Sequence, residues 1–69
     1  MYSLVGVNGN AFSVMGYVTR IMKRNHYSKA AMDEYVNDAM SGDYDHLLQV
    51  SMNMVDELNE VNPDDEDDW

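Results

Sequence analysis

Three stretches of this sequence repeat apolar residues at intervals of three and four, and each follows a residue typical of a helix start. The periodicity predicts three helices, over residues 11–25, 29–40 and 44–60. The residues before them carry side-chain oxygens that can cap a first turn: Asn10, Ser28 and Asp43. Both connections are only a few residues long, so successive helices should be antiparallel or sharply angled neighbours. The expected fold class is mostly α, with three short helices packed as a small bundle.

The apolar stripes predict which side chains form the core. In the first helix they are Phe12, Met15, Val18 or Thr19, and Met22, widened by Ala11, Val14 and Ile21. In the second they are Met32, Tyr35, Val36, Ala39 and Met40. In the third they are Tyr44, Leu47, Leu48, Ser51, Val55 and Leu58, flanked by Met54 and Val61. Gly16 indicates the close approach of another helix, or a gap that faces a ligand, and Gly42 is expected in the left-handed conformation that ends the second helix.

The first seven residues alternate loosely and include two valines, which favours a short strand or extended segment over residues 1–7. A lone strand leaves backbone groups unpaired, so it needs a partner strand from a second chain or a seat against the helices. Seven of the 69 residues are Met, a side chain that adapts to irregular contacts. We therefore expect a homodimer made by this segment and the Met-rich helix faces.

The length and the absence of cysteine restrict how the chain can be stabilised. Residues 1–62 are expected to form a single small helical domain, near the size at which one core is only just adequate. There is no Cys, so disulfides and thiolate metal sites are excluded. No apolar run approaches the ~20 residues that span a bilayer, and the start of the chain lacks the features of a signal peptide. The expected location is the cytoplasm, with no membrane partner.

Charge is divided unevenly along the chain. Residues 43–69 hold ten of the thirteen acidic residues and no Lys or Arg. The basic residues form a candidate basic patch at and just beyond the end of the first helix: Arg20, Lys23, Arg24 and Lys29. In an up-down-up bundle this patch should lie near the acids that end the third helix: Asp56, Glu57 and Glu60. The net charge of −9 would repel a phosphate backbone, so direct nucleic-acid binding is not expected.

Pro63 should end any helix, and the residues after it are expected to form a disordered acidic tail, residues 63–69. The candidate partner-binding residues of this tail are Asp64, Asp65, Glu66, Asp67, Asp68 and Trp69. Acids followed by a terminal aromatic resemble the C-terminal tips of single-stranded-DNA-binding proteins, which dock into basic pockets on their partners. A tail that only improves solubility is the alternative, and an acidic surface that mimics nucleic acid is a further one.

Chemistry-bearing groups are sparse. The two imidazoles, His26 and His46, lie on different predicted elements, so no metal site is expected. No nucleophile motif is present, and we assign no catalytic residue and no cofactor. The turn Asn8-Gly9-Asn10 precedes a helix whose first N–H groups can bind an anion. It is a candidate anion-binding turn, and it leaves open a protein that sequesters a nucleotide or another small molecule.

Two segments carry a family resemblance. One is Gly6-Val7-Asn8-Gly9-Asn10-Ala11-Phe12 followed by Met15-Gly16, and the other is Ala39-Met40-Ser41-Gly42-Asp43-Tyr44-Asp45-His46-Leu47-Leu48. Over residues 4–58 the chain resembles small acidic proteins of tailed bacteriophages and prophages, with a GNA-aromatic turn and an SGDY-x-x-LL helix start. The resemblance implies no particular activity. It implies a bacterial cytoplasm and a non-enzymatic protein that binds, and inhibits or redirects, a host protein during host takeover. The alternatives are an acidic mimic that inhibits a DNA- or RNA-binding defence enzyme, and a sequestering protein.

Overall fold

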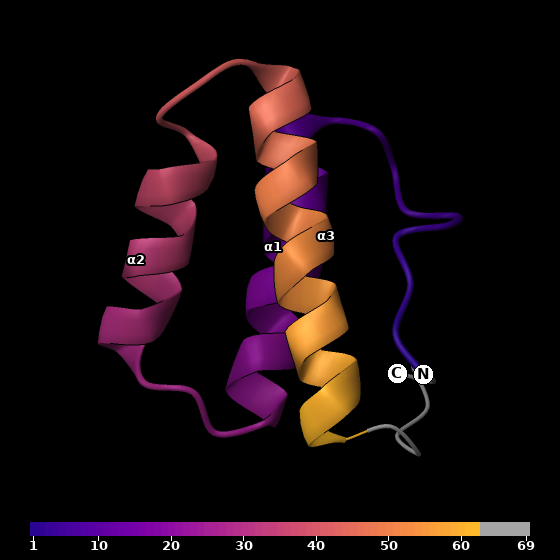
Figure 1. The fold of residues 1–69 in the computed structure, drawn as a ribbon, viewed down its shortest axis with the longest axis vertical. Coiled ribbons are helices and arrows are strands. Elements are labelled where there is room, and N and C mark those ends of the chain that lie inside the picture. The colour runs from indigo at the N-terminus through magenta and orange to yellow at the C-terminus, as the bar shows by residue number, and fades with distance from the viewer. Residues whose placement is uncertain (63–69) are drawn as a thin grey trace.

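A computed structural model describes residues 1–62 and shows three helices packed against one another (Figure 1). They are α1 (Ala11–Arg24), α2 (Lys29–Ala39) and α3 (Tyr44–Val61). Each helix begins at its predicted residue and ends within one residue of its predicted end. The predicted mostly α fold is therefore confirmed. Residues 1–62 contain no strand, and the predicted acidic tail lies outside the described residues.

The three predicted capping residues all cap their helices. The side chain of Asn10 accepts a hydrogen bond from the N–H of Phe12 at 2.9 Å. Ser28 Oγ accepts from the third residue beyond it, Ala31, at 3.1 Å, and Asp43 Oδ1 accepts from His46 at 2.9 Å. Each cap satisfies an N–H that has no partner within the helix and stabilises the helix start by about 1 kcal/mol.

α1 ends in a Schellman motif with a histidine at the position that glycine usually fills. The N–H of His26 donates to the carbonyl of Lys23 at 3.0 Å, and that of Tyr27 donates to Met22 at 2.9 Å. His26 has φ of 66°, in the left-handed region that β-carbon crowding disfavours. The hydrogen bonds of the motif and the contact of Tyr27 with the bundle hold the histidine in this conformation.

The expected left-handed conformation of Gly42 is wrong, since the one glycine with positive φ in residues 1–62 is Gly6, at 86°. Side chains satisfy the end of α2 instead. The carbonyl of Asp38 accepts from Ser41 Oγ at 2.6 Å and lies 2.9 Å from His46 Nε2. A Cβ placed on Gly42 would lie 2.9 Å from the Cβ and Cγ of His46. Position 42 therefore needs glycine because the His46 ring packs against its backbone.

The helices alternate in direction, so α2 is antiparallel to both α1 and α3 (Figure 1). At one end, the Asn62 side chain donates to Asn25 Oδ1 at 3.3 Å, which joins the residues that cap the C-termini of α3 and α1. At the other end, the hydroxyl of Tyr44 donates to the carbonyl of Gly9. The two outer helices of the sequence are thus tied together at both ends, and the basic end of α1 lies at the same end of the bundle as the acidic end of α3.

Most of the predicted core is buried. The buried apolar side chains are Val14, Met15, Val18, Ile21 and Met22 of α1, Tyr35 and Ala39 of α2, Leu47, Val55 and Leu58 of α3, and Tyr2. Four predicted core residues are wrong: Phe12 is 74% exposed, Val61 59%, Met40 57% and Tyr44 44%. All four lie at or next to a helix end, and Phe12, Met40 and Tyr44 line one hollow at the same end of the bundle.

Gly16 does not mark a close helix contact. A Cβ built there meets no atom within 4 Å apart from its own helix, and the residue is exposed. The buried stripe of α1 runs through Val14, Val18 and Ile21, which leaves Gly16 on the solvent side. Neither alternative given for this glycine, a helix contact or a ligand-facing gap, agrees with its position.

One polar pair lies inside the core. The hydroxyl groups of Tyr35 and Ser51 are 2.6 Å apart, and both residues are buried. Burial raises the pKa of Tyr35, and the hydrogen bond with Ser51 partly offsets that increase. Within residues 1–62, every buried side-chain nitrogen or oxygen has a hydrogen-bond partner, so the core carries no unsatisfied polar atom.

Candidate functional site

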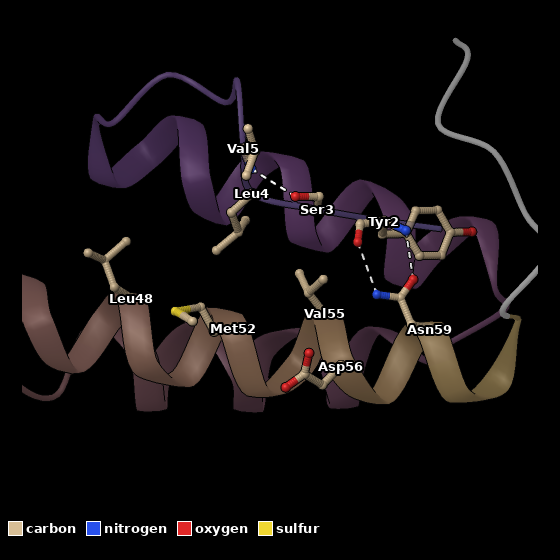
Figure 2. A pocket seen from close by; sticks show the side chains of 9 residues that line it. All are labelled: Tyr2, Ser3, Leu4, Val5, Leu48, Met52, Val55, Asp56 and Asn59. Atoms are coloured by element: carbon tan, nitrogen blue, oxygen red, sulfur yellow. Dashed lines mark hydrogen bonds between the residues drawn. The ribbon is translucent and has the colours of Figure 1, made fainter.

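The N-terminal segment lies along α3, and a reciprocal pair of hydrogen bonds attaches it there (Figure 2). The N–H of Tyr2 donates to Asn59 Oδ1 at 2.6 Å, and Asn59 Nδ2 donates to the carbonyl of Tyr2 at 3.0 Å. The Tyr2 ring is 2% exposed, and its hydroxyl accepts from Asn25 Nδ2 at 3.2 Å. One side-chain amide thus satisfies both backbone groups of residue 2, as a neighbouring strand would.

The same segment uses three more of its backbone N–H groups within the chain. Four N–H groups are satisfied within the chain: Tyr2 donates to Asn59, Ser3 to Tyr17, Val5 to Ser3 and Val7 to Leu4. The sequence allowed either a partner strand from a second chain or packing against the helices, and the segment packs against the helices. Four N–H groups are therefore not available to pair with a strand of a second chain.

A groove of about 430 Å³ separates residues 2–5 from α3, and we call it the α3 groove. Leu4 points from the segment toward α3, and Leu48 and Met52 reach toward Leu4 from the helix (Figure 2). Val55 forms part of the wall, and Asp56 is the one charged residue in the lining. The groove therefore offers mainly aliphatic and thioether surface.

Exposed apolar side chains border the α3 groove. Met52 is 53% exposed, and Val5, which points away from α3, is 91% exposed (Figure 2). A second hollow, of about 240 Å³, lies at the other end of the bundle among Phe12, Met40 and Tyr44. Single exposed apolar residues are common on proteins, but those beside the α3 groove add to a recess that is already apolar.

The residues of the predicted basic patch lie in different surroundings. Lys29 forms an ion pair at 2.9 Å with Asp33 of its own helix, which raises the pKa of the lysine. Lys23 and Arg24 occupy the last turn of α1, where cations complement the helix dipole. Near this end of the bundle, the carboxylate of Glu57 accepts a hydrogen bond from the hydroxyl of Tyr27, in the connection between α1 and α2, at 2.8 Å. The pKa of Tyr27 is raised to about 12, mainly by burial and then by the hydrogen bond and charge of Glu57.

The predicted anion-binding turn uses part of its donors internally. Asn8 Oδ1 accepts from the N–H of Asn10 at 2.9 Å, Asn10 Oδ1 accepts from the N–H of Phe12, and Gly9 accepts from Tyr44. The turn thus serves the start of α1 and its junction with α3. This geometry does not assign it a ligand.

The two histidines lie at the ends of different helices. His46 binds the end of α2, and His26 ends α1, so the two imidazoles serve different helix ends. Among residues 1–62, no three His, Cys, Asp or Glu side chains come together as a metal site would require. The candidate partner-binding residues of the tail lie outside the described residues.

Sequence reasoning missed the residues that build the α3 groove. Tyr2 and Asn59 are 57 positions apart, and no local pattern links them. The sequence did contain a signal for this contact, namely a tyrosine at the second position and three asparagines near helix ends, Asn25, Asn59 and Asn62. An asparagine near a helix end is more often a cap, so this signal does not point to a chain-terminal contact.

Comparison of the chain with protein-family models, curated proteins and solved structures found no match. The resemblance to bacteriophage proteins therefore remains an expectation based on two short segments. Within residues 1–62, none of the helices combines the length and the hydropathy needed to cross a membrane.

Proposed function

We propose that this chain is a non-enzymatic binding protein that attaches to a host protein through the α3 groove and inhibits or redirects that host protein. The observation that carries the proposal is an apolar recess of about 430 Å³ with one charged residue, Asp56, in its lining. An apolar recess takes up an apolar side chain of a partner, and burial of one such side chain contributes about 1.5–3 kcal/mol. The bacterial cytoplasm, implied by the family resemblance, is part of the same proposal.

The hydrogen bonds between Tyr2 and Asn59 support this function because they fix one wall of the recess. A wall that is already ordered does not have to be ordered on binding, so less conformational entropy is lost. Met52 at the rim supplies a flexible thioether that can adjust to the partner's surface. Fixed apolar walls with one adaptable side chain suit recognition of a protein surface.

Capture from bacterial lysate with a matched pair of variants tests the proposal. Met52→Glu places a charge at the rim of the α3 groove, and Gln49→Glu places the same charge on an exposed α3 residue outside the groove lining. Proteins retained by the wild type should also be retained by Gln49→Glu and lost with Met52→Glu, with binding weakened at least about tenfold. Retention of the same proteins by Met52→Glu would contradict a role for the groove.

The homodimer expected from the sequence is the competing occupant of the α3 groove, and it would use the groove in place of strand pairing. Sedimentation of wild type and Met52→Glu at several concentrations separates the two occupants. A mass that rises with concentration in the wild type and stays monomeric in Met52→Glu indicates a second copy in the groove. A monomer in both cases leaves the groove to a host protein.

A further inference from the structure

A second groove runs along the outside of the bundle between α2 and α3, on a different face from the α3 groove. It measures about 320 Å³, and we call it the acidic groove. Its floor is apolar, with half-buried side chains of Ala31, Val50 and Met54 over the buried Met22. A smaller hollow of about 200 Å³ continues it past Asn53. The recess is therefore elongated, and it exposes apolar surface along two helices.

Three carboxylates border this apolar floor, namely Glu34, Asp38 and Glu57. All three residues are exposed, and no described Lys or Arg lies in the lining. Glu57 accepts a hydrogen bond from the Tyr27 hydroxyl, and the Asp38 carboxylate lies 3.3 Å from His46 Nε2. The hydrogen bond from Tyr27 orients a carboxylate without cancelling its charge, so the edges of the groove present negative potential beside an apolar strip.

The spacing of the lining residues defines the shape of an occupant. On α2 they stand at positions 31, 34, 35 and 38, and on α3 at 50, 54 and 57, which is one helical face on each element. Seven residues of helix rise about 10 Å, so the groove follows both helices for two turns. The groove between two packed helices is the place where a further helix packs, as in a four-helix bundle.

We propose that the acidic groove binds an amphipathic, basic helix of a partner protein. Apolar side chains of that helix at i, i+3 or i+4, and i+7 contact the floor, and Lys or Arg on either side of them meet the three carboxylates. Charge complementarity decides the class of partner, since an acidic helix, a nucleic acid and an anionic membrane surface are all repelled from these edges. This site is distinct from the α3 groove and does not depend on that groove being occupied.

The methyl signals of the methionines can show where a peptide binds, because different methionines line different hollows. Met54 and Met22 line the acidic groove, Met52 lines the α3 groove, and Met40 lines the hollow at the far end of the bundle. Methyl-labelled methionine in the full-length protein is titrated with a synthetic Leu/Lys peptide, about 18 residues long, whose leucines follow helical spacing. The methyl signals of Met54 and Met22 should shift and saturate, while those of Met52 and Met40 stay in place. A peptide of the same composition in scrambled order should produce no saturable shift.

Matched charge variants show whether the groove or the overall acidity binds the peptide. The double variant Glu34→Gln/Glu57→Gln should weaken the peptide at least about tenfold, because two charge contacts are lost. Asp45→Asn/Glu60→Gln removes two exposed carboxylates outside the lining and should change the affinity less than about threefold. Wild-type-like methyl spectra of the free variants confirm that they are folded. Equal weakening by both pairs, or equal shifts at Met52 and Met54, would overturn the proposal.

Two further outcomes are decisive. If the wild type self-associates and Glu34→Gln/Glu57→Gln does not, the occupant is a second copy of this chain and the proposed partner is wrong. If Met52→Glu loses its lysate partner but still binds the peptide at Met54, the two grooves act independently. Loss of peptide binding with intact lysate capture would contradict the acidic groove alone, so its failure is distinguishable from failure of the proposed function.

Discussion

His26 holds a backbone conformation that costs an L-residue about 1–2 kcal/mol. Replacing it with glycine removes this cost, although glycine also loses about 0.5–1 kcal/mol more chain entropy on folding. His26→Gly should therefore raise the free energy of unfolding by about 0.5–1 kcal/mol, which urea unfolding followed by circular dichroism can measure. Gly6→Ala is the opposite control, since Gly6 has φ of 86° with no atom within 4 Å of an added Cβ, and it should destabilise. A His26→Gly variant less stable than wild type would contradict the argument.

Gly16 and Gly42 should respond in opposite ways to alanine. Gly16→Ala adds a methyl group to an exposed helix interior with open space around it, and it should stabilise by about 1 kcal/mol. Gly42→Ala puts a Cβ 2.9 Å from the ring of His46, so the ring must move from the end of α2, and it should destabilise by about 1–3 kcal/mol. Thermal unfolding of the two variants beside wild type measures both effects. A stabilising Gly42→Ala would show that the contact with His46 does not constrain position 42.

At the level of elements, the helix starts were predictable because a cap is a local signal. Asn10, Ser28 and Asp43 each lie within three residues of the N–H that they accept. The core was less predictable at the helix ends, since a stripe defines a face but does not say how far a neighbour covers it. Phe12 and Met40 follow the helical period and still lie in solvent.

The α3 groove was not predictable from local patterns. It depends on residues 2–5 crossing back over the last helix, and this path is fixed by the contact between Tyr2 and Asn59. The pattern of residues 1–7 indicated an extended segment and did not indicate the helix that it would cover. The acidic groove, in contrast, was partly predictable, because Glu57 was predicted among the acids near the end of the third helix.

The hydroxyl of Tyr27 links the connection between α1 and α2 to α3, and this link gives a pH dependence. Its pKa is raised from 10.0 to about 12, first by burial and then by the hydrogen bond to Glu57 and the charge of Glu57. Because the folded value lies above the unfolded one, the contact contributes stability fully below pH 10 and loses it as pH rises through about 12. The difference in tyrosinate absorbance between wild type and Tyr27→Phe should therefore show a midpoint near 12.

Glu57→Gln should move that midpoint toward 10 without reaching it, because burial, the first cause, remains. Glu60→Gln is the matched control on the same helix and should leave the midpoint unchanged. A midpoint near 10 in the wild type would show that the contact between Tyr27 and Glu57 is not maintained in solution.

For the whole molecule, the described structure and the acidic end of the chain occupy different parts of the sequence. The three caps, the buried core and both grooves all lie in this range. Five of the thirteen acids, at positions 64–68, lie beyond it, so their removal changes the net charge from −9 to −4. Like charges repel most at low ionic strength, and the acidic end of the chain should therefore influence stability through salt-dependent repulsion.

Deletion of residues 63–69 tests this division of roles. The shortened protein should unfold cooperatively with a free energy within about 0.5 kcal/mol of wild type in moderate salt, since it keeps every residue of the core described within residues 1–62. Its unfolding midpoint should also depend less on salt, because fewer like charges remain to be screened. Lysate capture with both forms then assigns the partner. If the shortened protein still retains the lysate partner and Met52→Glu does not, recognition occurs in the α3 groove. Capture lost on deletion of the acids and Trp69 from an otherwise folded protein transfers recognition to the tail and contradicts the proposed function as stated.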